Sequence, residues 1–342
     1  MKAAIHNPYL DTLGGGERYT VSFAKVLVDE GWDVDLEWSG PDIKDSLNKR
    51  FGIDLSKVNI VSDIKRGDGY DLCFWISDGS IPALKSRKNI LHFQVPFHGV
   101  NGASLMNKMK LFRINEIVCN SEFTKKVIDE EYGVNSKVIY PPIDTESFKS
   151  KRKENIILYV GRFSKLKQNK HQEVLIKTFI EMVDSGLKDW KLVLAGGSEV
   201  GSGTFIQELK RMIIGYPIQI IESPDFKTLK SLYGVAKIFW SAAGFGENEL
   251  EEPENFEHFG MSLVEAMSAS CCPVVYGVGG HKEIIENTVN GFFFFTTKEL
   301  VSITNKLINQ KSYLREISLK SKESSKRYSY SNFKSNVIMS LK

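Results

Sequence analysis

The sequence predicts an α/β protein built from two doubly wound parallel-sheet domains. The chain has 342 residues with 42% apolar content, which is more than a single hydrophobic core usually holds. Strand-like segments alternate with helix-like segments through both halves. The polar run from Lys149 to Glu154 between the halves is typical of an interdomain linker. We therefore expect domains at residues 1–148 and 154–312, followed by a helical segment at 313–342 that could cross back to the first domain.

The first half opens with a strand, a glycine loop, a helix and a second strand, which together form a parallel βαβ unit. Residues 2–6 give the first strand, the periodic run 17–29 gives the helix, which Gly31 ends, and residues 33–38 alternate as the second strand. Further strands of this half are predicted at 58–61, 71–76, 89–93, 116–119 and 137–140.

The same alternation restarts after the linker. Strands are predicted at 156–160, 191–195, 218–222, 237–240, 273–276 and 292–295, and helices at 172–184, 204–213, 226–234 and 261–269. In such sheets ligands bind at the carboxyl ends of the strands, so two facing domains would leave a binding cleft there. The loops that follow the strands are therefore where we look for functional residues.

The composition limits the partners and the compartment. Lys and Arg number 45 against 42 Asp and Glu, a net charge of +3 that is too balanced for a protein whose main partner is nucleic acid. Its four cysteines lie in apolar segments without Cys-x-x-Cys spacing, which is typical of a reducing compartment. No apolar window approaches the roughly 20 residues of a membrane span, and the opening residues do not form a secretory leader. We expect a cytoplasmic protein.

The stretch from Glu257 to Glu265 is the strongest candidate for a ligand site. Gly260 precedes an apolar run with helical spacing, so the N–H groups of Gly260, Met261 and Ser262 would lie at a helix start and could bind an anion. The two glutamates would flank this positive potential. The arrangement suits a nucleoside-diphosphate sugar, with its charged middle and hydroxyls at both ends. The alternative is that both glutamates are ordinary surface residues of an amphipathic helix.

A glycine loop in the first half is the second candidate. Gly14, Gly15 and Gly16 stand between the first strand and its helix, where successive glycines let backbone amides approach a ligand closely. The loop lacks the spacing of a dinucleotide fingerprint and the Lys-Ser/Thr of a P-loop. A plain flexible loop is the alternative.

A basic loop in the second half is the third candidate. Arg162 follows the first strand there, and its planar guanidinium could pair with phosphate oxygens while a lysine farther along adds a point charge. Together these cations could neutralise a departing nucleoside diphosphate without a metal ion. A solvated basic loop is the alternative.

These segments resemble the motifs of retaining glycosyltransferases of family 4. The stretch from Glu257 to Met267 resembles the family's Glu-x7-Glu motif, residues 14–17 resemble its Gly-Gly-x-Glu loop, and residues 161–179 resemble its Gly-Arg-Phe signature. The resemblance spans nearly the whole chain, from Gly14 to about Leu300. It implies the GT-B fold, in which two facing Rossmann-like domains enclose an interdomain cleft, with the acceptor on the first half, a nucleotide-sugar donor on the second, and retention of anomeric configuration.

The resemblance also implies a role for each candidate residue. Glu265 would bind the ribose and Arg162 the diphosphate, while Glu257 with the amides of Phe259, Gly260 and Met261 would hold the sugar. Lys167 fits the family's usual spacing from the arginine, whereas Lys170 fits its flanking residues. The phosphate lysine is therefore open between these two, and we prefer Lys170.

In the first half, the resemblance implies that Gly15 and Gly16 face the donor and that His92, or the backbone next to it, lies beside the reacting sugar. A lone histidine is otherwise more often a structural hydrogen-bonding residue. The candidate catalytic residues are thus His92, Arg162, Lys170 and Glu257.

The implied reaction moves a hexose of the mannose or glucose type from a GDP- or UDP-linked donor to a saccharide or lipid-linked acceptor, with no metal and no cofactor. The chain looks somewhat like mannosyltransferases that extend lipid-linked oligosaccharides, which favours GDP-mannose over UDP-hexoses. Two alternatives stay open: a dinucleotide- or nucleotide-sugar-modifying enzyme of the epimerase type, and a non-catalytic sugar-binding homologue.

Two polar segments have simpler interpretations that we prefer. The acidic run from Glu247 to Glu254 could bind a cation, but an exposed loop accounts for it. Residues 104–113 combine apolar side chains with lysine and arginine, which a surface helix of a soluble protein explains. Peripheral docking on an anionic membrane, close to a lipid-linked acceptor, is the alternative for this helix.

Overall fold

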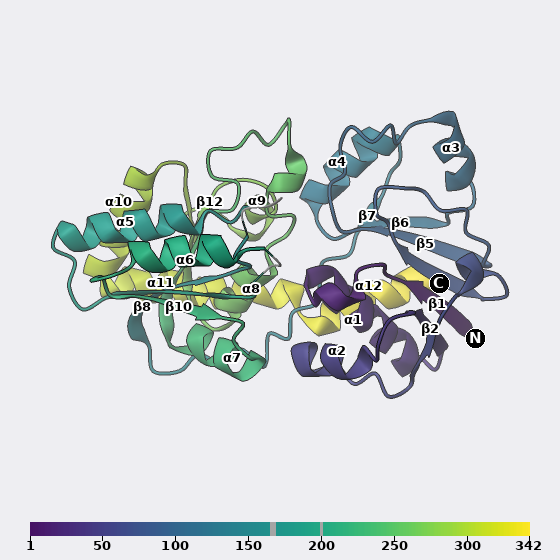
Figure 1. The fold of residues 1–342 in the computed structure, drawn as a ribbon, viewed down its shortest axis with the longest axis horizontal. Coiled ribbons are helices and arrows are strands. Elements are labelled where there is room, and N and C mark those ends of the chain that lie inside the picture. Colours follow the sequence, from purple (N-terminus) through teal and green to yellow (C-terminus); the bar gives the residue numbers. More distant parts are fainter. Residues whose placement is uncertain (165–168, 199–200) are drawn as a thin grey trace. The chain divides into compact units, whose positions relative to one another are not determined.

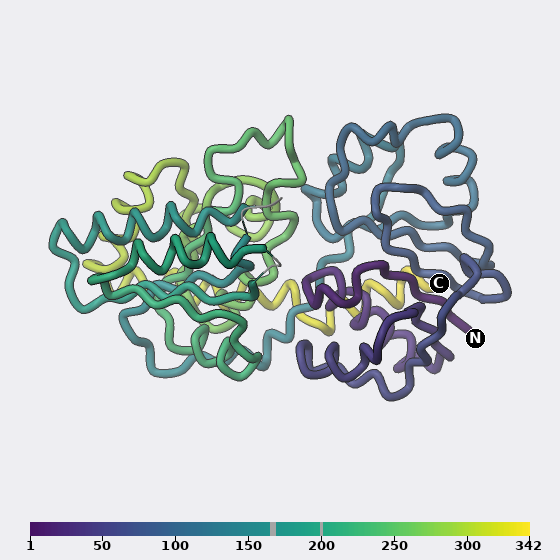
Figure 2. The backbone as a smooth tube through the Cα atoms, viewed as in Figure 1, coloured from purple at the N-terminus to yellow at the C-terminus, as the bar shows by residue number. Residues whose placement is uncertain are grey.

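The computed structural model describes residues 1–164, 169–198 and 201–342, and the chain divides into two α/β units (Figure 1). Unit 1 consists of Met1–Pro142 together with Tyr330–Lys342, and unit 2 of Ile143–Ser329. Both chain ends therefore belong to unit 1, as the tube in Figure 2 shows. Among the described residues, none of the helices combines the length and the apolar character needed to cross a bilayer.

Unit 1 is built on a seven-stranded parallel sheet in the order β3-β2-β1-β4-β5-β6-β7. Its strands are β1 (Lys2–His6), β2 (Asp33–Glu37), β3 (Val58–Val61), β4 (Leu72–Ile76), β5 (Lys88–Phe93), β6 (Glu116–Cys119) and β7 (Lys137–Val138). Its helices are α1 (Gly15–Asp29), α2 (Lys44–Phe51), α3 (Leu105–Leu111), α4 (Glu122–Tyr132) and α12 (Tyr330–Leu341), with short 3-10 turns at Leu10–Thr12 and Lys65–Gly67.

Unit 2 is built on a six-stranded parallel sheet in the order β10-β9-β8-β11-β12-β13. Its strands are β8 (Glu154–Val160), β9 (Lys191–Gly196), β10 (Ile218–Glu222), β11 (Ala236–Ser241), β12 (Cys272–Tyr276) and β13 (Phe292–Phe294). Its helices are α5 (Gln172–Asp184), α6 (Gly203–Met212), α7 (Phe226–Val235), α8 (Met261–Ser268), α9 (His281–Ile284), α10 (Thr297–Asn309) and α11 (Lys311–Ser325), with 3-10 turns η3 (Pro253–Asn255) and η4 (Lys326–Tyr328). The predicted α/β class with parallel sheets in both halves is thereby confirmed.

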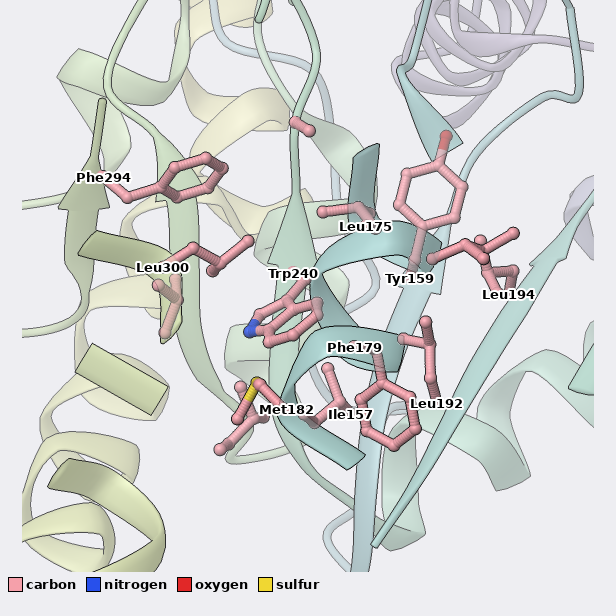
Figure 3. Packing of buried hydrophobic residues seen from close by; sticks show 14 of the residues in the cluster. Ile157, Tyr159, Leu175, Phe179, Met182, Leu192, Leu194, Trp240, Phe294 and Leu300 are labelled. Atoms are coloured by element: carbon pink, nitrogen blue, oxygen red, sulfur yellow. The ribbon is translucent and has the colours of Figure 1, made fainter. Parts of the chain in front are cut away.

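The core of unit 2 is centred on Trp240 of β11 (Figure 3). Its ring is fully buried and lies edge-on to Phe179 of α5, with 6.4 Å between ring centroids. Its indole N–H donates to Thr304 Oγ1 at 3.2 Å, so the one polar atom of the ring is satisfied inside the core. Truncation to alanine would remove this packing and cost about 3–5 kcal/mol of stability.

The last helix completes the core of unit 1. Phe333 and Val337 of α12 are buried with residues of the first sheet, and Phe333 packs edge-on against Tyr19 with 5.1 Å between centroids. The segment expected as one helical run at 313–342 is thus two helices, α11 in unit 2 and α12 in unit 1. The break at Lys326–Ser329 lies where the chain leaves unit 2.

The polar run at 149–154 is not the boundary between the units, which the structure places at Pro142 and Ile143. Lys151 donates its backbone N–H to the Gly234 carbonyl at 2.9 Å. Lys153 Nζ donates to the carbonyls of Ala236 at 2.7 Å and Ala269 at 2.6 Å. The run is exposed as its polarity predicts, except at the half-buried Lys153, whose side chain satisfies carbonyl groups at the ends of neighbouring elements.

Candidate functional site

The start of α8 is shaped by Gly260, which has φ +113° and precedes the first helical residue. Only glycine adopts this backbone conformation readily, so the chain can turn sharply into the helix there. The buried face of α8 packs on α11 and on β11 and β12, which fixes the direction of the helix. The first amides of a helix have no partner within it, and they carry the positive end of its dipole.

A pair of glycines, Gly279 and Gly280, holds the loop before α8 in place. Gly280 donates its N–H to the Glu257 carbonyl at 2.7 Å. A Cβ atom at Gly279 would lie 2.6 Å from the Glu257 carbonyl oxygen, and one at Gly280 would lie 2.5 Å from Phe259 Cα. The two segments therefore lie backbone against backbone, which only glycine permits.

Lys170 and Glu257 form an ion pair at the heart of this region. Lys170 Nζ donates to Glu257 Oε2 at 3.1 Å, and the lysine side chain is largely buried. Burial by itself would raise the pKa of Glu257, but the charge and hydrogen bond of Lys170, together with the nearby His281 and His258, outweigh it and hold that pKa below its usual value. The carboxylate is therefore charged at neutral pH and can accept hydrogen bonds from hydroxyl groups.

His281 lies next to this pair, at the start of α9. Its Nδ1–H donates to the Tyr276 carbonyl at 2.9 Å, and burial lowers the pKa of His281 although Glu257 nearby opposes the shift. The imidazole is thus neutral at pH 7, with its proton on Nδ1. The sequence analysis did not single out His281.

Arg162 projects from the loop after β8, and its side chain is exposed. Its carbonyl accepts a hydrogen bond from Gln172 Nε2 at 2.6 Å, and the same amide group donates to Tyr159 Oη at 3.2 Å. Gln172 is fully buried at the start of α5, so it fixes the backbone from which the guanidinium extends. Lys167, the other candidate for the phosphate lysine, lies outside the described residues.

Glu265 is half-buried on α8 and is oriented by a residue that the sequence analysis missed. Tyr233 of α7 is fully buried and donates its hydroxyl to Glu265 Oε2 at 3.0 Å. The two residues are 32 positions apart in the chain, so only the packing of α7 on α8 reveals the pair. A carboxylate held in this way keeps its second oxygen in a defined direction.

The acidic run is only partly the exposed loop that we expected. Glu251 and Glu252 are exposed, but Glu247 Oε1 lies 3.1 Å from His171 Nε2. Glu249 lies 2.8 Å from Lys282 Nζ and accepts the Gly279 N–H at 3.1 Å. Two of the acidic residues therefore tie this loop to the segments around Lys170 and Gly280. Among the described residues, no group of three or more His, Cys, Asp or Glu side chains is placed to hold a metal ion.

In unit 1 the glycine loop is organised by Glu17. Its Oε2 accepts the Gly14 N–H at 2.6 Å and the Thr12 hydroxyl at 2.8 Å, which caps α1. Gly15 is exposed and Gly16 half-buried, and a Cβ at Gly16 would lie 3.5 Å from Gln94 Cγ. The backbone of this loop thus lies beside Gln94.

The side chain of His92 lies inside the core of unit 1. It is fully buried, stacks on Tyr19 with 4.1 Å between ring centroids, and donates from Nε2 to Gln94 Oε1 at 2.7 Å. Burial lowers the pKa of His92 to about 4, so the ring is neutral. His92 is predicted at the end of a strand, but the sequence could not show that its face of the sheet is covered by α1. Gln94 is the half-buried side chain that it orients.

The chain is similar to known proteins in sequence and in fold. The family model described as "Glycosyl transferases group 1" matches residues 142–324. GDP-Man:Man(3)GlcNAc(2)-PP-Dol alpha-1,2-mannosyltransferases are similar to the chain: that of Dictyostelium discoideum is 24% identical over 62% of this chain and 43% of its own length, and that of Neurospora crassa 25% identical over 64% and 44%. The chain thus spans less than half the length of these relatives.

Among solved structures, Anabaena HepE in complex with UDP and glucose is similar with a TM-score of 0.76 at 18% sequence identity, covering 100% of this chain and 99% of that one. HepE has the GT-B fold, and the predicted GT-B fold class is confirmed by this likeness. At this identity the likeness concerns the fold alone.

Proposed function

The chain belongs to the glycosyl transferases group 1 family, and on that premise we propose that it transfers a hexose from a nucleoside-diphosphate sugar to a saccharide or lipid-linked acceptor. The observation that carries the proposal is the Lys170–Glu257 ion pair beside the start of α8, with Nζ and Oε2 3.1 Å apart. The pair brings a cation and a charged carboxylate to a helix start, whose first amides could bind an anion. A diphosphate and an adjoining sugar need these three groups together.

The diphosphate would bind across the start of α8. The amides of Gly260 and Met261 would donate to one phosphate, and Arg162 and Lys170 would supply positive charge as the bond to the sugar breaks. Lys167 stays an alternative to Lys170 for this contact. Glu257, kept charged by Lys170, would accept hydrogen bonds from sugar hydroxyls together with the Phe259 amide.

Glu265 would bind the ribose. A ribose diol offers two hydroxyl donors, and a carboxylate is the side chain that accepts both. The hydroxyl of Tyr233 on Oε2 favours one rotamer of Glu265 before any ligand arrives. Preorganisation of this kind lowers the entropy cost of binding the donor.

Catalysis in this proposal consists of orienting the reactants and stabilising the leaving diphosphate, so it needs no protein nucleophile and no metal ion. Retention would follow from attack on the face that the diphosphate leaves. A double displacement through a covalent intermediate is the competing mechanism for the same outcome. Gly15 and Gly16 of unit 1 would contribute backbone amides to the donor, and Gln94, held by His92, would replace the His92 side chain next to the sugar.

GDP-mannose is the donor that we propose first. The related proteins of Dictyostelium and Neurospora are described as GDP-Man-dependent mannosyltransferases, and they act on a dolichol-linked saccharide. HepE was solved with UDP and glucose, which keeps UDP-hexoses as the second candidate. A lipid-linked acceptor would place this protein at the cytoplasmic face of a membrane.

The test is release of nucleoside diphosphate across a panel of GDP- and UDP-linked sugars, with and without saccharide acceptors. Release from GDP-mannose that depends on Arg162 and Glu265 would support the proposal, and release from UDP-sugars only would end the mannose assignment. An enzyme of the epimerase type would instead bind NAD tightly, and NAD rather than GDP or UDP would stabilise the folded protein. A non-catalytic homologue would bind donors with no release above that of an Arg162→Ala variant.

A further inference from the structure

Helix α3 of unit 1 and the loop before it carry a concentrated set of exposed apolar side chains. Phe112 is 94% exposed, Leu105 77%, Met109 67%, Met106 66% and Val100 43%. We call these five residues the α3 patch. Isolated apolar residues on a surface are ordinary, but five within one short segment mark a place where another surface binds.

The residues of α3 are arranged with apolar and basic side chains on separate sides. At about 100° per residue, Leu105, Met109 and Phe112 share one side of the helix and Met106 adjoins them. Lys108 and Lys110 then fall on the two borders of this side. Leu111 lies on the opposite side and packs against the core around Phe93 and Tyr132. The apolar side of α3 therefore points away from its own domain.

The segment is held firmly, so its exposure is not that of a loose loop. Glu131 of α4 accepts the N–H groups of Gly99 at 2.9 Å, Val100 at 3.1 Å and Gly102 at 2.9 Å. A Cβ at Gly102 would lie 2.7 Å from the Tyr132 ring, so this turn lies directly on α4. In Figure 1, α3 stands at the outer edge of unit 1.

The segment that carries the α3 patch is basic, and the Glu131 carboxylate of α4 lies against it at Val100. Residues 79–115 contain no Asp or Glu, and they contain Lys85, Arg87, Lys88, Lys108, Lys110 and Arg113. The two groups of cations adjoin, because Asn89 Nδ2 donates to the Arg113 carbonyl at 2.8 Å. Arg87 pairs with Asp71 at 3.0 Å and Lys85 with Asp68 at 3.8 Å, but Arg87 and Lys85 are mostly exposed, and exposed pairs contribute little.

We propose that the α3 patch docks on an anionic lipid surface, with Leu105, Met109 and Phe112 entering the interface and Lys108 and Lys110 contacting lipid phosphates. An interfacial helix has this composition: apolar on one side, basic at its borders, and too short to span. A second copy of the chain is a poorer occupant, since it would bring the same lysines together. This inference goes beyond the proposed function and does not depend on the identity of the donor.

Flotation of the full chain with lipid vesicles tests the proposal. We expect binding to vesicles of phosphatidylcholine with phosphatidylglycerol, weaker binding at higher salt, and little binding to phosphatidylcholine alone. The double variant Leu105→Ser/Phe112→Ser should reduce the partition coefficient roughly tenfold or more. Lys108→Glu/Lys110→Glu should reduce it at least about fivefold.

Matched controls replace residues of similar exposure in unit 2. Ile214 is 75% exposed and Leu319 56%, so Ile214→Ser/Leu319→Ser should bind vesicles as the parent chain does. Lys227→Glu/Lys298→Glu changes the net charge equally at exposed sites and should also have little effect. The proposal is overturned if the parent chain ignores anionic vesicles, or if the two α3 variants bind no worse than their controls. It is equally overturned if sedimentation shows a dimer that Leu105→Ser/Phe112→Ser dissociates, because a second copy would then cover the patch.

Discussion

Lys170 and Glu257 stand 87 positions apart in the chain, yet the lysine Nζ lies 3.1 Å from the glutamate Oε2. Lys170 follows β8 and Glu257 precedes α8, so the order of strands in the sheet of unit 2 brings them together. The pair explains how a partly buried carboxylate stays charged. It also means that the residues expected on the diphosphate and on the sugar are already in contact.

Replacing Lys170 by methionine should remove this compensation while keeping much of the side-chain volume. Glu257 has a lowered pKa in the folded protein, so the pair contributes stability above the unfolded pKa of about 4.3, and this contribution is lost as pH falls through the lower folded value. Thermal unfolding measured against pH should therefore show Lys170→Met less stable than the parent at pH 7, with the gap closing in acid. Lys177→Met, on the exposed side of α5, is the control. A difference in stability between Lys170→Met and the parent that stays unchanged in acid would contradict this explanation.

Tyr233→Phe should weaken donor binding with little effect on turnover. The variant loses only the hydroxyl that donates to Glu265 and keeps the buried ring. The expected rise in the donor KM is about three- to tenfold, the usual net worth of one hydrogen bond. Tyr216→Phe, which removes a hydroxyl near Asp184, should leave KM unchanged. An equal effect of both variants, or a loss confined to kcat, would argue against a ribose role for Glu265.

Gly280→Ala should disrupt the loop before α8. The added methyl group would lie 2.5 Å from Phe259 Cα, so one of the two backbone segments must move. We expect a loss of about 1–3 kcal/mol in the free energy of unfolding, together with a large loss of nucleotide binding. Gly197→Ala is the matched control, since a Cβ there meets nothing within 4 Å. Unchanged denaturation midpoints and binding in Gly280→Ala would show that the close contact is unimportant.

His171 should titrate above the usual histidine range. Burial would lower the pKa of His171, but hydrogen bonds to Glu173 and Glu247 outweigh it and raise the pKa. Its stabilising contribution is therefore complete below the unfolded pKa of about 6.5 and is lost as pH rises through the folded value.

An NMR titration of the imidazole in the parent and in Glu247→Gln tests this directly. The variant should shift the midpoint of His171 downward, with Glu173 maintaining part of the effect, and hydrogen exchange in the loop at 246–255 should become faster at pH 6. Glu251→Gln, an exposed change in the same loop, is the control. If Glu247→Gln leaves the titration midpoint of His171 unchanged, the side chains of His171 and Glu247 are not coupled in solution.

The sequence alone determined the class of each domain and the position of nearly every strand. A strand that is buried on both faces appears in the sequence as a short apolar run, whatever its position in the sheet. Glycines and prolines mark the turns between such runs. The motif from Glu257 to Glu265 was equally visible, since a glycine before a periodic apolar run predicts a helix start from local information only.

The tertiary structure decided what these segments contact. The pairs Lys170–Glu257 and Tyr233–Glu265 join positions far apart in the chain, and no local pattern carries that information. Burial could not be predicted for His92, which is covered by Tyr19 of α1, or for Lys153, whose side chain satisfies carbonyl groups inside unit 2. A polar side chain gives the same local signal whether it faces solvent, a ligand or a buried partner, and only the packing of distant elements distinguishes these cases.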